Sequence, residues 1–309
     1  MIRYVIKRLL LTIPVVFCVA VLIFTILFFT PGDPATAILG PGATSEERAQ
    51  VHETLGLDEP YFVQLGKFLL QLVRLDLGES WVYRTNISQE IAARLPRTAA
   101  ISIYSVLISA ILGIPLGILA AVHQDGIADK VVLVGSSVMR CIPNFWIGMM
   151  LLLWIAMNFT WFPINGVSTW KGYILPCAAL TFCNAAPLMR LTRSAMLETI
   201  RSDYIRTARA KGALEKRVIW KHALKNALLP VVTNIGNNFR ALLGGSVITE
   251  TVFVIPGLGS YVISAIRSKD VPVVMGCTLF MSATFLIVIL LTDILYAYID
   301  PRVKAKYMK

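Results

Sequence analysis

Six apolar runs constrain the fold of this chain more than any other feature. A helix needs about 20 apolar residues to cross the ~30 Å hydrocarbon core of a bilayer, and most of the runs reach that length. With 56% hydrophobic and 15% charged residues, the chain is not an ordinary soluble domain. We therefore predict an all-α integral membrane protein with six transmembrane helices. The runs lie near residues 9–29, 98–122, 131–157, 174–189, 227–254 and 273–299.

The segment from Arg190 to Lys225 is the longest polar interval between two of these runs. It holds ten Lys and Arg residues against three acids. Because Lys and Arg close to membrane helices resist translocation, this segment should lie in the cytoplasm. Its small and apolar residues recur at intervals of three and four as far as Gly212, where a positive φ can form a sharp turn. We predict a helix-turn-helix with small residues at its tip, between the fourth and fifth transmembrane helices.

The charges beside the other runs give a consistent topology. Arg3, Lys7 and Arg8 precede the first run, which predicts a cytoplasmic N-terminus. The first run is longer than the about 7–15 apolar residues of a signal peptide, which favours a retained helix over a cleaved one. The predicted divisions are 1–30 for the N-terminus and first helix, 31–97 for an external segment, 98–299 for a five-helix core that includes the basic loop 190–226, and 300–309 for a cytoplasmic tail.

The predicted external segment carries helical signals of its own. Thr44 and Glu47 have the spacing of a capping box, and Gly56 is placed to end the helix that they begin. Residues 61–75 have a second amphipathic pattern, which is typical of packing on a membrane or on neighbouring helices. We therefore predict an external helical segment after the first transmembrane helix.

The fifth run is the least lipid-like of the six. At 100° per residue, five of its polar or small residues fall within about one third of the helix circumference. Because a polar stripe is costly in lipid, it should face a neighbouring helix or a water-filled path. A translocation path for a polar solute and close helix packing both explain the stripe. Its members are Asn234, Asn237, Asn238, Gly245 and Thr249.

Two ionisable residues, Arg140 and Asp293, fall inside apolar runs. Each lies about nine residues or fewer from the predicted cytoplasmic end, hence ~9–14 Å deep at 1.5 Å per residue. Their similar depth allows an intramembrane ion pair. Extension of the Arg140 side chain toward the cytoplasm explains that residue equally well.

The sequence contains no catalytic set. His52, His123 and His222 are scattered over both predicted sides of the membrane, and none of the five cysteines has CxxC spacing, so we predict neither a metal site nor a disulfide framework. No G-x-x-x-x-G-K-[ST] phosphate loop is present, so ATP-driven work would require another polypeptide. The net charge of +11 lies beside membrane helices rather than on a soluble face, which argues against nucleic-acid binding.

Several motifs resemble the ABC-transporter permeases of the dipeptide/oligopeptide/nickel importer group. Arg206-Thr207-Ala208 followed by Gly212 resembles their cytoplasmic coupling loop, although the general permease motif has Glu-Ala in the first two places and a proline where Lys225 stands. The likeness covers nearly the whole chain. Its other pieces are PGDPA at 31–35, LGLDEP at 55–60, DLG at 76–78, RLP at 94–96, PNFWIG at 143–148 and ETVFVIPGLG at 250–259.

The resemblance implies a permease subunit of a bacterial or archaeal inner-membrane importer that works by alternating access. Its implied partners are a second homologous permease, two cytoplasmic ATPase subunits that carry ATP and Mg²⁺, and an external solute-binding protein. The substrate remains open among dipeptides, oligopeptides, nickel chelates and glutathione-like solutes. The residues that the resemblance assigns to ATPase coupling are Arg206, Thr207, Ala208, Ala210, Lys211, Gly212 and Ala213.

Two other functional classes compete with this interpretation. A self-sufficient secondary carrier or channel would need ion-coupling carboxylates near the middle of the membrane, and the candidates Glu250 and Asp293 lie near the ends of their runs. A membrane-bound enzyme would need a nucleophile with a base, or a metal cluster, and the sequence supplies neither. Dependence on a separate ATPase distinguishes the importer from both.

Overall fold

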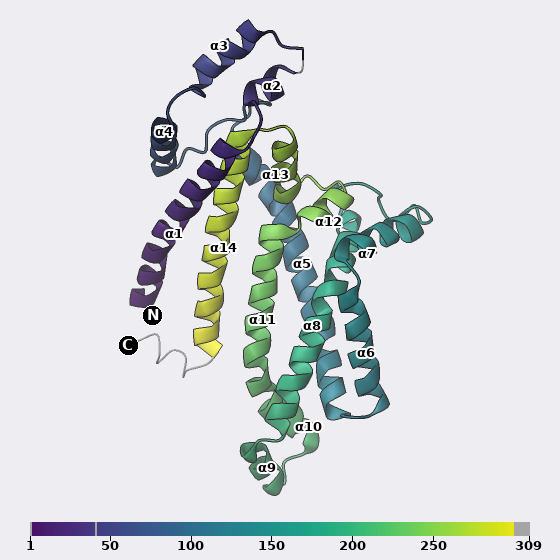
Figure 1. The fold of residues 1–309 in the computed structure, drawn as a ribbon. Coiled ribbons are helices and arrows are strands. Elements are labelled where there is room, and N and C mark those ends of the chain that lie inside the picture. Colours follow the sequence, from purple (N-terminus) through teal and green to yellow (C-terminus); the bar gives the residue numbers. More distant parts are fainter. Residues whose placement is uncertain (1, 41, 300–309) are drawn as a thin grey trace. The chain divides into compact units, whose positions relative to one another are not determined.

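The computed structural model describes residues 2–40 and 42–299, and Figure 1 shows its helices. Within that part of the chain the regular structure is helical, apart from one isolated bridge between Glu79 and Asn86, so the all-α class is confirmed. The chain forms two compact units. We call residues 2–98 with 256–287 the α1 unit, and residues 99–255 with 288–299 the α8 unit. The predicted tail, 300–309, lies outside the described residues.

The α1 unit contains the predicted helical segment. As predicted, the side chain of Thr44 accepts from the N–H of Glu47 while the Glu47 carboxylate accepts from the N–H of Thr44, which forms the capping box. Gly56 ends that helix in a left-handed conformation, with φ 65°. The elements of the unit are α1 (Ile2–Phe29), α2 (Pro34–Leu39), α3 (Ser45–Leu55), α4 (Tyr61–Val73), the start of α5 (Ile87–Val122), α13 (Leu258–Arg267) and the first part of α14 (Val271–Ile299).

The core of the α1 unit joins α5 to α13 and α14 through Ile87, Leu258, Val273 and Cys277, all of them buried. A buried carboxylate fastens a loop to this core. Asp270, 1% exposed, accepts hydrogen bonds from Ser80 Oγ at 2.5 Å and from the N–H of Trp81 at 3.1 Å. Satisfying a buried carboxylate in this way avoids the cost of an unpaired charge.

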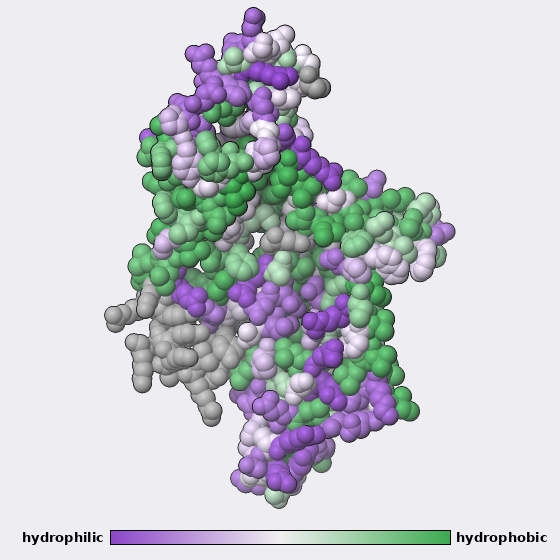
Figure 2. All heavy atoms as spheres, viewed as in Figure 1, coloured by the Kyte–Doolittle hydropathy of each residue, from purple (hydrophilic) through white to green (hydrophobic). Residues whose placement is uncertain are grey.

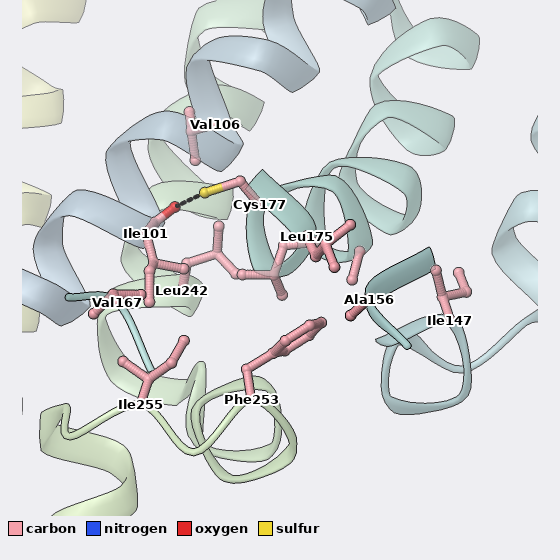
Figure 3. Close-up of a cluster of buried hydrophobic side chains, with 12 residues drawn as sticks. Ile101, Val106, Ile147, Ala156, Val167, Leu175, Cys177, Leu242, Phe253 and Ile255 are labelled. Carbon is pink, nitrogen blue, oxygen red and sulfur yellow. Dashed lines mark hydrogen bonds between the residues drawn. The ribbon is translucent and has the colours of Figure 1, made fainter. Parts of the chain in front are cut away.

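The α8 unit is built around its longest complete helix, α8 (Ile174–Ile200). Figure 3 shows one part of its core, where buried side chains from α5, α8 and α11 gather with Phe253 and Ile255. There Cys177 Sγ donates to the carbonyl of Ile101 at 3.9 Å. The other elements are the rest of α5, α6 (Ile127–Cys141), α7 (Asn144–Leu151), a π-helical turn (Leu152–Ala156), a 3₁₀ turn (Trp170–Tyr173), α9 (Asp203–Ala210), α10 (Glu215–Arg217), a second π-helical turn (Val218–Ala223), α11 (Leu224–Gly245), α12 (Val247–Val252) and the end of α14.

Four helical segments of the described chain are long and apolar enough to cross a membrane: Arg8–Phe29, Ile87–Val122, Trp170–Ile200 and Val271–Ile294. A fifth span exists if α6 is counted together with the segment Asn144–Ala156, which comprises α7 and the first π-helical turn. The two parts meet at an angle of 92°. The uninterrupted third span expected over 131–157 is therefore wrong. Pro143 forces Ile142 into extended backbone, which ends α6. With 22 residues α11 is long enough but too polar to meet the same criteria, so the count of six spans stays a prediction.

Two further sequence expectations need correction. The fifth run does not form one helix through Val254, because α11 ends at Gly245 and α12 begins after Ser246. The position of all five cysteines in or beside apolar runs predicts buried thiols, but only Cys177 and Cys277 are buried, whereas Cys18 and Cys141 are exposed. An apolar run does not reveal which side of its helix faces the protein.

Candidate functional site

The predicted helix-turn-helix is present at one end of the α8 unit. Ser202, in extended backbone, precedes α9, and Gly212 follows it with φ +78°, a conformation that favours glycine. The N–H of Ala213 then donates to the carbonyl of Ala208 at 3.2 Å, which closes the end of the helix. Figure 1 shows α9 and α10 beyond the ends of α8 and α11. We call residues 203–217 the coupling turn.

An ion pair spans the coupling turn. Arg209 donates to the carboxylate of Glu215 from Nε at 3.0 Å and from Nη2 at 2.6 Å. This two-point contact with Arg209 lowers the pKa of Glu215 and raises that of Arg209. Both side chains are exposed, by 40% and 57%, so the pair shapes the turn more than it stabilises the fold.

A buried apolar anchor fixes the coupling turn to the rest of the unit. Ile205 of α9 is fully buried in a cluster with Met196 of α8 and with Val218 and Ala223 of the second π-helical turn. Next to it, Asn226 Nδ2 donates to the hydroxyl of Tyr204 at 2.8 Å. Because close-packed side chains transmit displacement, a force on α9 would reach both α8 and α11.

The outer surface of the coupling turn is cationic. Figure 2 shows hydrophilic residues over α9 and α10. Of the seven residues assigned to coupling by resemblance, Ala208 and Ala213 are half-buried, and the exposed ones are Arg206, Thr207, Ala210, Lys211 and Gly212. Sequence reasoning missed Leu214, whose side chain is 78% exposed directly after the turn. The sequence shows that an apolar residue stands among charged ones at this position, but it does not show that the side chain is exposed.

The polar stripe of the fifth run is only partly on one helix. Asn234, Asn237 and Asn238 lie on α11, where Asn238 Nδ2 donates to Asn234 Oδ1 at 3.2 Å, and Asn237 is exposed. Gly245 is the last residue of α11. Thr249 is buried on the separate helix α12, so it does not extend the stripe.

The face of α11 that carries Gly236 packs against α14. A Cβ built on Gly236 would lie 2.3 Å from the Cγ2 atom of Thr292. At 100° per residue, Gly236 points about 160° away from Asn234. The small residue therefore serves helix packing, and the asparagines are left on another side of the helix, as a polar path requires.

Arg140 and Asp293 are placed on different helices of the α8 unit. Arg140 is exposed in the last turn of α6, and Asp293 is half-buried on α14. The ion pairs identified among the described residues do not include this one, and it stays a prediction. A different pair, which sequence reasoning missed, joins Asp129 of α6 to Arg193 of α8. Their separation by 64 residues left no local signal.

The α1 unit contains a second polar site. A cavity of about 690 Å³ is lined by apolar residues such as Phe24 and Phe68 and by polar ones such as Asp33 and His52. His52 lies between two carboxylates, with Nδ1 2.9 Å from Asp58 and Nε2 2.9 Å from Asp33. Hydrogen bonds to Asp58 and Asp33 raise the pKa of His52. No group of His, Cys, Asp and Glu side chains in the described chain is arranged to hold a metal ion.

Known proteins match this chain over nearly its whole length. Residues 113–305 match the family model described as the binding-protein-dependent transport system inner membrane component, and residues 1–102 match the model for the N-terminal part of such components. The glutathione transport system permease protein GsiC of Escherichia coli (strain K12) is 39% identical over 306 residues, covering 99% of this chain and 100% of that one. The oligopeptide transport system permease protein AppB of Bacillus subtilis (strain 168) is 38% identical over 315 residues, with 98% and 100% covered.

A solved structure resembles the fold. The inward-facing MetNI methionine ABC transporter includes a chain that superposes with a TM-score of 0.59 at 18% identity. The match covers 69% of this chain and 97% of that one. At this identity the likeness concerns the fold alone.

Proposed function

This chain belongs to the family of binding-protein-dependent transport system inner-membrane components, and from that premise we propose that it moves a peptide or a related small polar solute into the cell. It is a multi-pass membrane protein and a permease component, not an enzyme by itself. In our proposal both termini are cytoplasmic, in a bacterial or archaeal inner membrane, because the basic segments then all fall on that side.

The coupling turn is the observation that carries the proposal. It is held rigidly by the buried Ile205 and by the Arg209–Glu215 pair, yet it presents Arg206, Lys211 and Leu214 outward. An exposed apolar side chain within a cationic rim is typical of a protein docking site. The proposed partner is a pair of cytoplasmic ATPase subunits that bind ATP and Mg²⁺, since this chain has no phosphate loop and no cofactor is proposed for it.

Transport would follow from movement of the coupling turn. Closure of the two ATPases on ATP would displace α9, and the helices anchored to it would shift between two arrangements. The solute would pass along Asn234, Asn237 and Asn238 of α11, with a second homologous permease providing the other side of the path. An external solute-binding protein would deliver the substrate.

The relatives favour a peptide-like solute. GsiC is named for glutathione, itself a small peptide, and AppB for oligopeptides. Nickel chelates remain within the proposed range. The asparagine amides of α11 can donate to and accept from a peptide backbone without selecting its side chains, which suits a path whose selectivity resides in the binding protein.

The test measures docking of the ATPase and uptake in the same preparation. The tagged chain is extracted from its native membrane in mild detergent, and the proteins that purify with it are identified by mass. The double variant Lys211→Glu, Leu214→Ser is compared with wild type. We expect an ATPase and a second permease with wild type, and loss of the ATPase alone with the variant.

Val73→Ser is the matched control, because Val73 of α4 is 82% exposed but lies far along the chain from the coupling turn. It should retain every companion. If the wild-type chain is recovered alone and moves solute into vesicles without ATP, it is a secondary carrier and the proposal fails.

A further inference from the structure

The start of α6 and the last turns of α8 are joined by a buried ion pair. Arg193 donates to Asp129 from Nε at 2.5 Å and from Nη2 at 2.6 Å. The Asp129 side chain is 2% exposed and that of Arg193 18%. Asp129 also accepts from the N–H of Asp125 at 2.9 Å, so its carboxylate binds three donors from two separate segments. A two-point Arg–carboxylate contact fixes orientation as well as distance.

The position of the pair resists separation of the two helices. Asp129 lies in the first turn of α6, where the helix dipole favours a negative charge. Pulling the pair apart would leave a carboxylate and a guanidinium unpaired in a largely buried site, which is strongly unfavourable. A second polar contact lies alongside, since Arg201 Nη2 donates to Gln124 Oε1 at 2.9 Å.

The same end of α8 carries the coupling turn. From Arg193 the helix continues to Ile200, and only Arg201 and Ser202 separate it from α9. On the side toward α6, an apolar cluster of Ala185 and Met189 with Val132 extends the contact above the ion pair. Helix α6 is therefore attached to α8 by an ion pair and an apolar cluster, and the segments just before α6 and just after α8 are joined by the contact between Gln124 and Arg201.

We propose that Asp129 and Arg193 are positioning residues for coupling, which make α6 move with α8 and α9 as one body when the coupling turn is displaced. This inference rests on the proposed function, because it assigns the route by which displacement of the coupling turn reaches a second membrane helix. Helix α6 leads through Pro143 into α7, whose Gly148 lies against the ring of Phe253 in the core of Figure 3. Movement of α6 would therefore reach the far end of the unit.

A distance measurement tests the rigid attachment directly. Spin labels are placed at Ile127, at the exposed start of α6, and at Glu198, on the exposed face of α8, in the transporter assembled with its companions. With the pair intact, the distance between labels should be the same without nucleotide and with ATP bound. In Asp129→Asn it should shift or broaden on ATP binding. A wild-type distance that changes with ATP, or an Asp129→Asn distance that does not, overturns the proposal.

A transport measurement tests the functional consequence. In vesicles holding the assembled transporter, the solute moved per ATP hydrolysed should fall at least about fivefold in Asp129→Asn, the lower end of typical coupling energies. Arg193→Lys keeps the charge but loses the two-point contact, so its loss should be smaller. Lys130→Gln changes a neighbouring exposed charge and should match wild type.

A purely structural role gives a different pattern. If Asp129→Asn and Arg193→Lys both fail to assemble with the ATPase, the pair is a folding determinant and the proposal is overturned. Normal solute movement per ATP in Asp129→Asn also overturns it. Failure of the proposed function is recognised separately, because the wild-type assembly would then show no ATP-driven uptake at all.

Discussion

Arg209, near the end of α9, is paired with Glu215, at the start of α10, within the coupling turn, with Arg209 Nη2 2.6 Å from the Glu215 carboxylate. Between them the chain passes through Gly212 and exposes Leu214. The pair contributes little to the stability of the fold because both side chains are exposed. Its effect is to hold the turn in one shape before a partner arrives, which reduces the ordering cost of docking.

Glu215→Gln should therefore weaken docking without unfolding the protein. Because the pair is exposed, the free energy of unfolding should change by no more than about 1 kcal/mol. A loosened turn should raise the Kd for the ATPase roughly two- to fivefold, the equivalent of about 0.4–1 kcal/mol. Titration of the purified ATPase onto the chain in nanodiscs measures this Kd.

Added salt should reduce the difference between Glu215→Gln and wild type, because exposed pairs are screened. Glu198→Gln is the control, since Glu198 is an exposed acid of the same basic segment. An unchanged Kd in Glu215→Gln at low salt would show that the pair does not shape the docking surface.

Gly212→Val should uncouple ATP hydrolysis from uptake. No atom lies within 4 Å of a Cβ built at Gly212, so the cost arises from the backbone, where φ is +78°. A non-glycine residue in the left-handed region costs roughly 1–2 kcal/mol, and a β-branched one is least tolerated. The turn should relax to another conformation and move Leu214, while insertion into the membrane is unaffected.

Gly212→Asn is the matched control, because asparagine adopts the left-handed region more readily than valine. The measurement is uptake per ATP hydrolysed in vesicles, with membrane content determined by immunoblot. Normal uptake in Gly212→Val, at normal membrane content, would remove Gly212 from the coupling role.

The sequence predicted the features that depend on local chemistry. The Thr44–Glu47 capping box, the stop at Gly56 and the turn at Gly212 each follow from a few neighbouring residues, and the structure has all three. The bend before α7 was also readable, because Ile142 precedes Pro143 and the residue before proline avoids helical backbone. The average hydrophobicity of residues 131–157 does not show this bend.

Other features depend on tertiary structure and were not readable. Nothing near Asp129 identifies Arg193, 64 residues away, as its partner. Thr249 falls on the polar stripe only if the helix continues past Ser246. Gly244 and Gly245 stand directly before that break, but glycine is also frequent inside membrane helices, so the pair did not identify the break before α12. Leu214 is 78% exposed although it is apolar, and no periodicity of the sequence describes that exposure.

The segment that contains α2 and α3 should loosen as the pH rises through the raised pKa of His52. Hydrogen bonds to Asp58 and Asp33 raise the pKa of His52 above its ordinary value of 6.5, so protonated His52 stabilises the folded segment. That contribution is fully present below pH 6.5 and is lost as the pH rises through the raised pKa.

Burial acts to raise the pKa of Asp33, but hydrogen bonds from His52, Ala35 and Thr36 outweigh it and lower the pKa below 3.8. The stabilisation by Asp33 is lost only as the pH falls through that lowered value.

Amide hydrogen exchange of residues 45–55 at pH 5.5 and pH 8.5, corrected for intrinsic exchange, measures this loosening. Protection should decrease at the higher pH in wild type, whereas His52→Gln should show the same low protection at both. His123→Gln, which removes an exposed histidine in another loop, should behave as wild type. Equal protection of wild type at the two pH values would mean that His52 does not hold this segment.

Gly117→Ala should shorten the lifetime of the folded protein, because α5 and α8 approach too closely there for a side chain. A Cβ on Gly117 would lie 2.6 Å from the carbonyl oxygen of Met189 and 2.6 Å from Cβ of Thr192, and neither atom is the end of a flexible side chain. Inserting a methyl group into such a contact typically costs about 1–3 kcal/mol.

Gly135→Ala, on α6, is the matched control, because no atom lies within 4 Å of its added Cβ and alanine favours a helix by up to about 1 kcal/mol. Inactivation half-lives at fixed temperature suit a membrane protein that unfolds irreversibly. We expect a shorter half-life for Gly117→Ala and an equal or longer one for Gly135→Ala. Equal half-lives for Gly117→Ala and wild type would mean that α5 and α8 are farther apart at this position than in the structure.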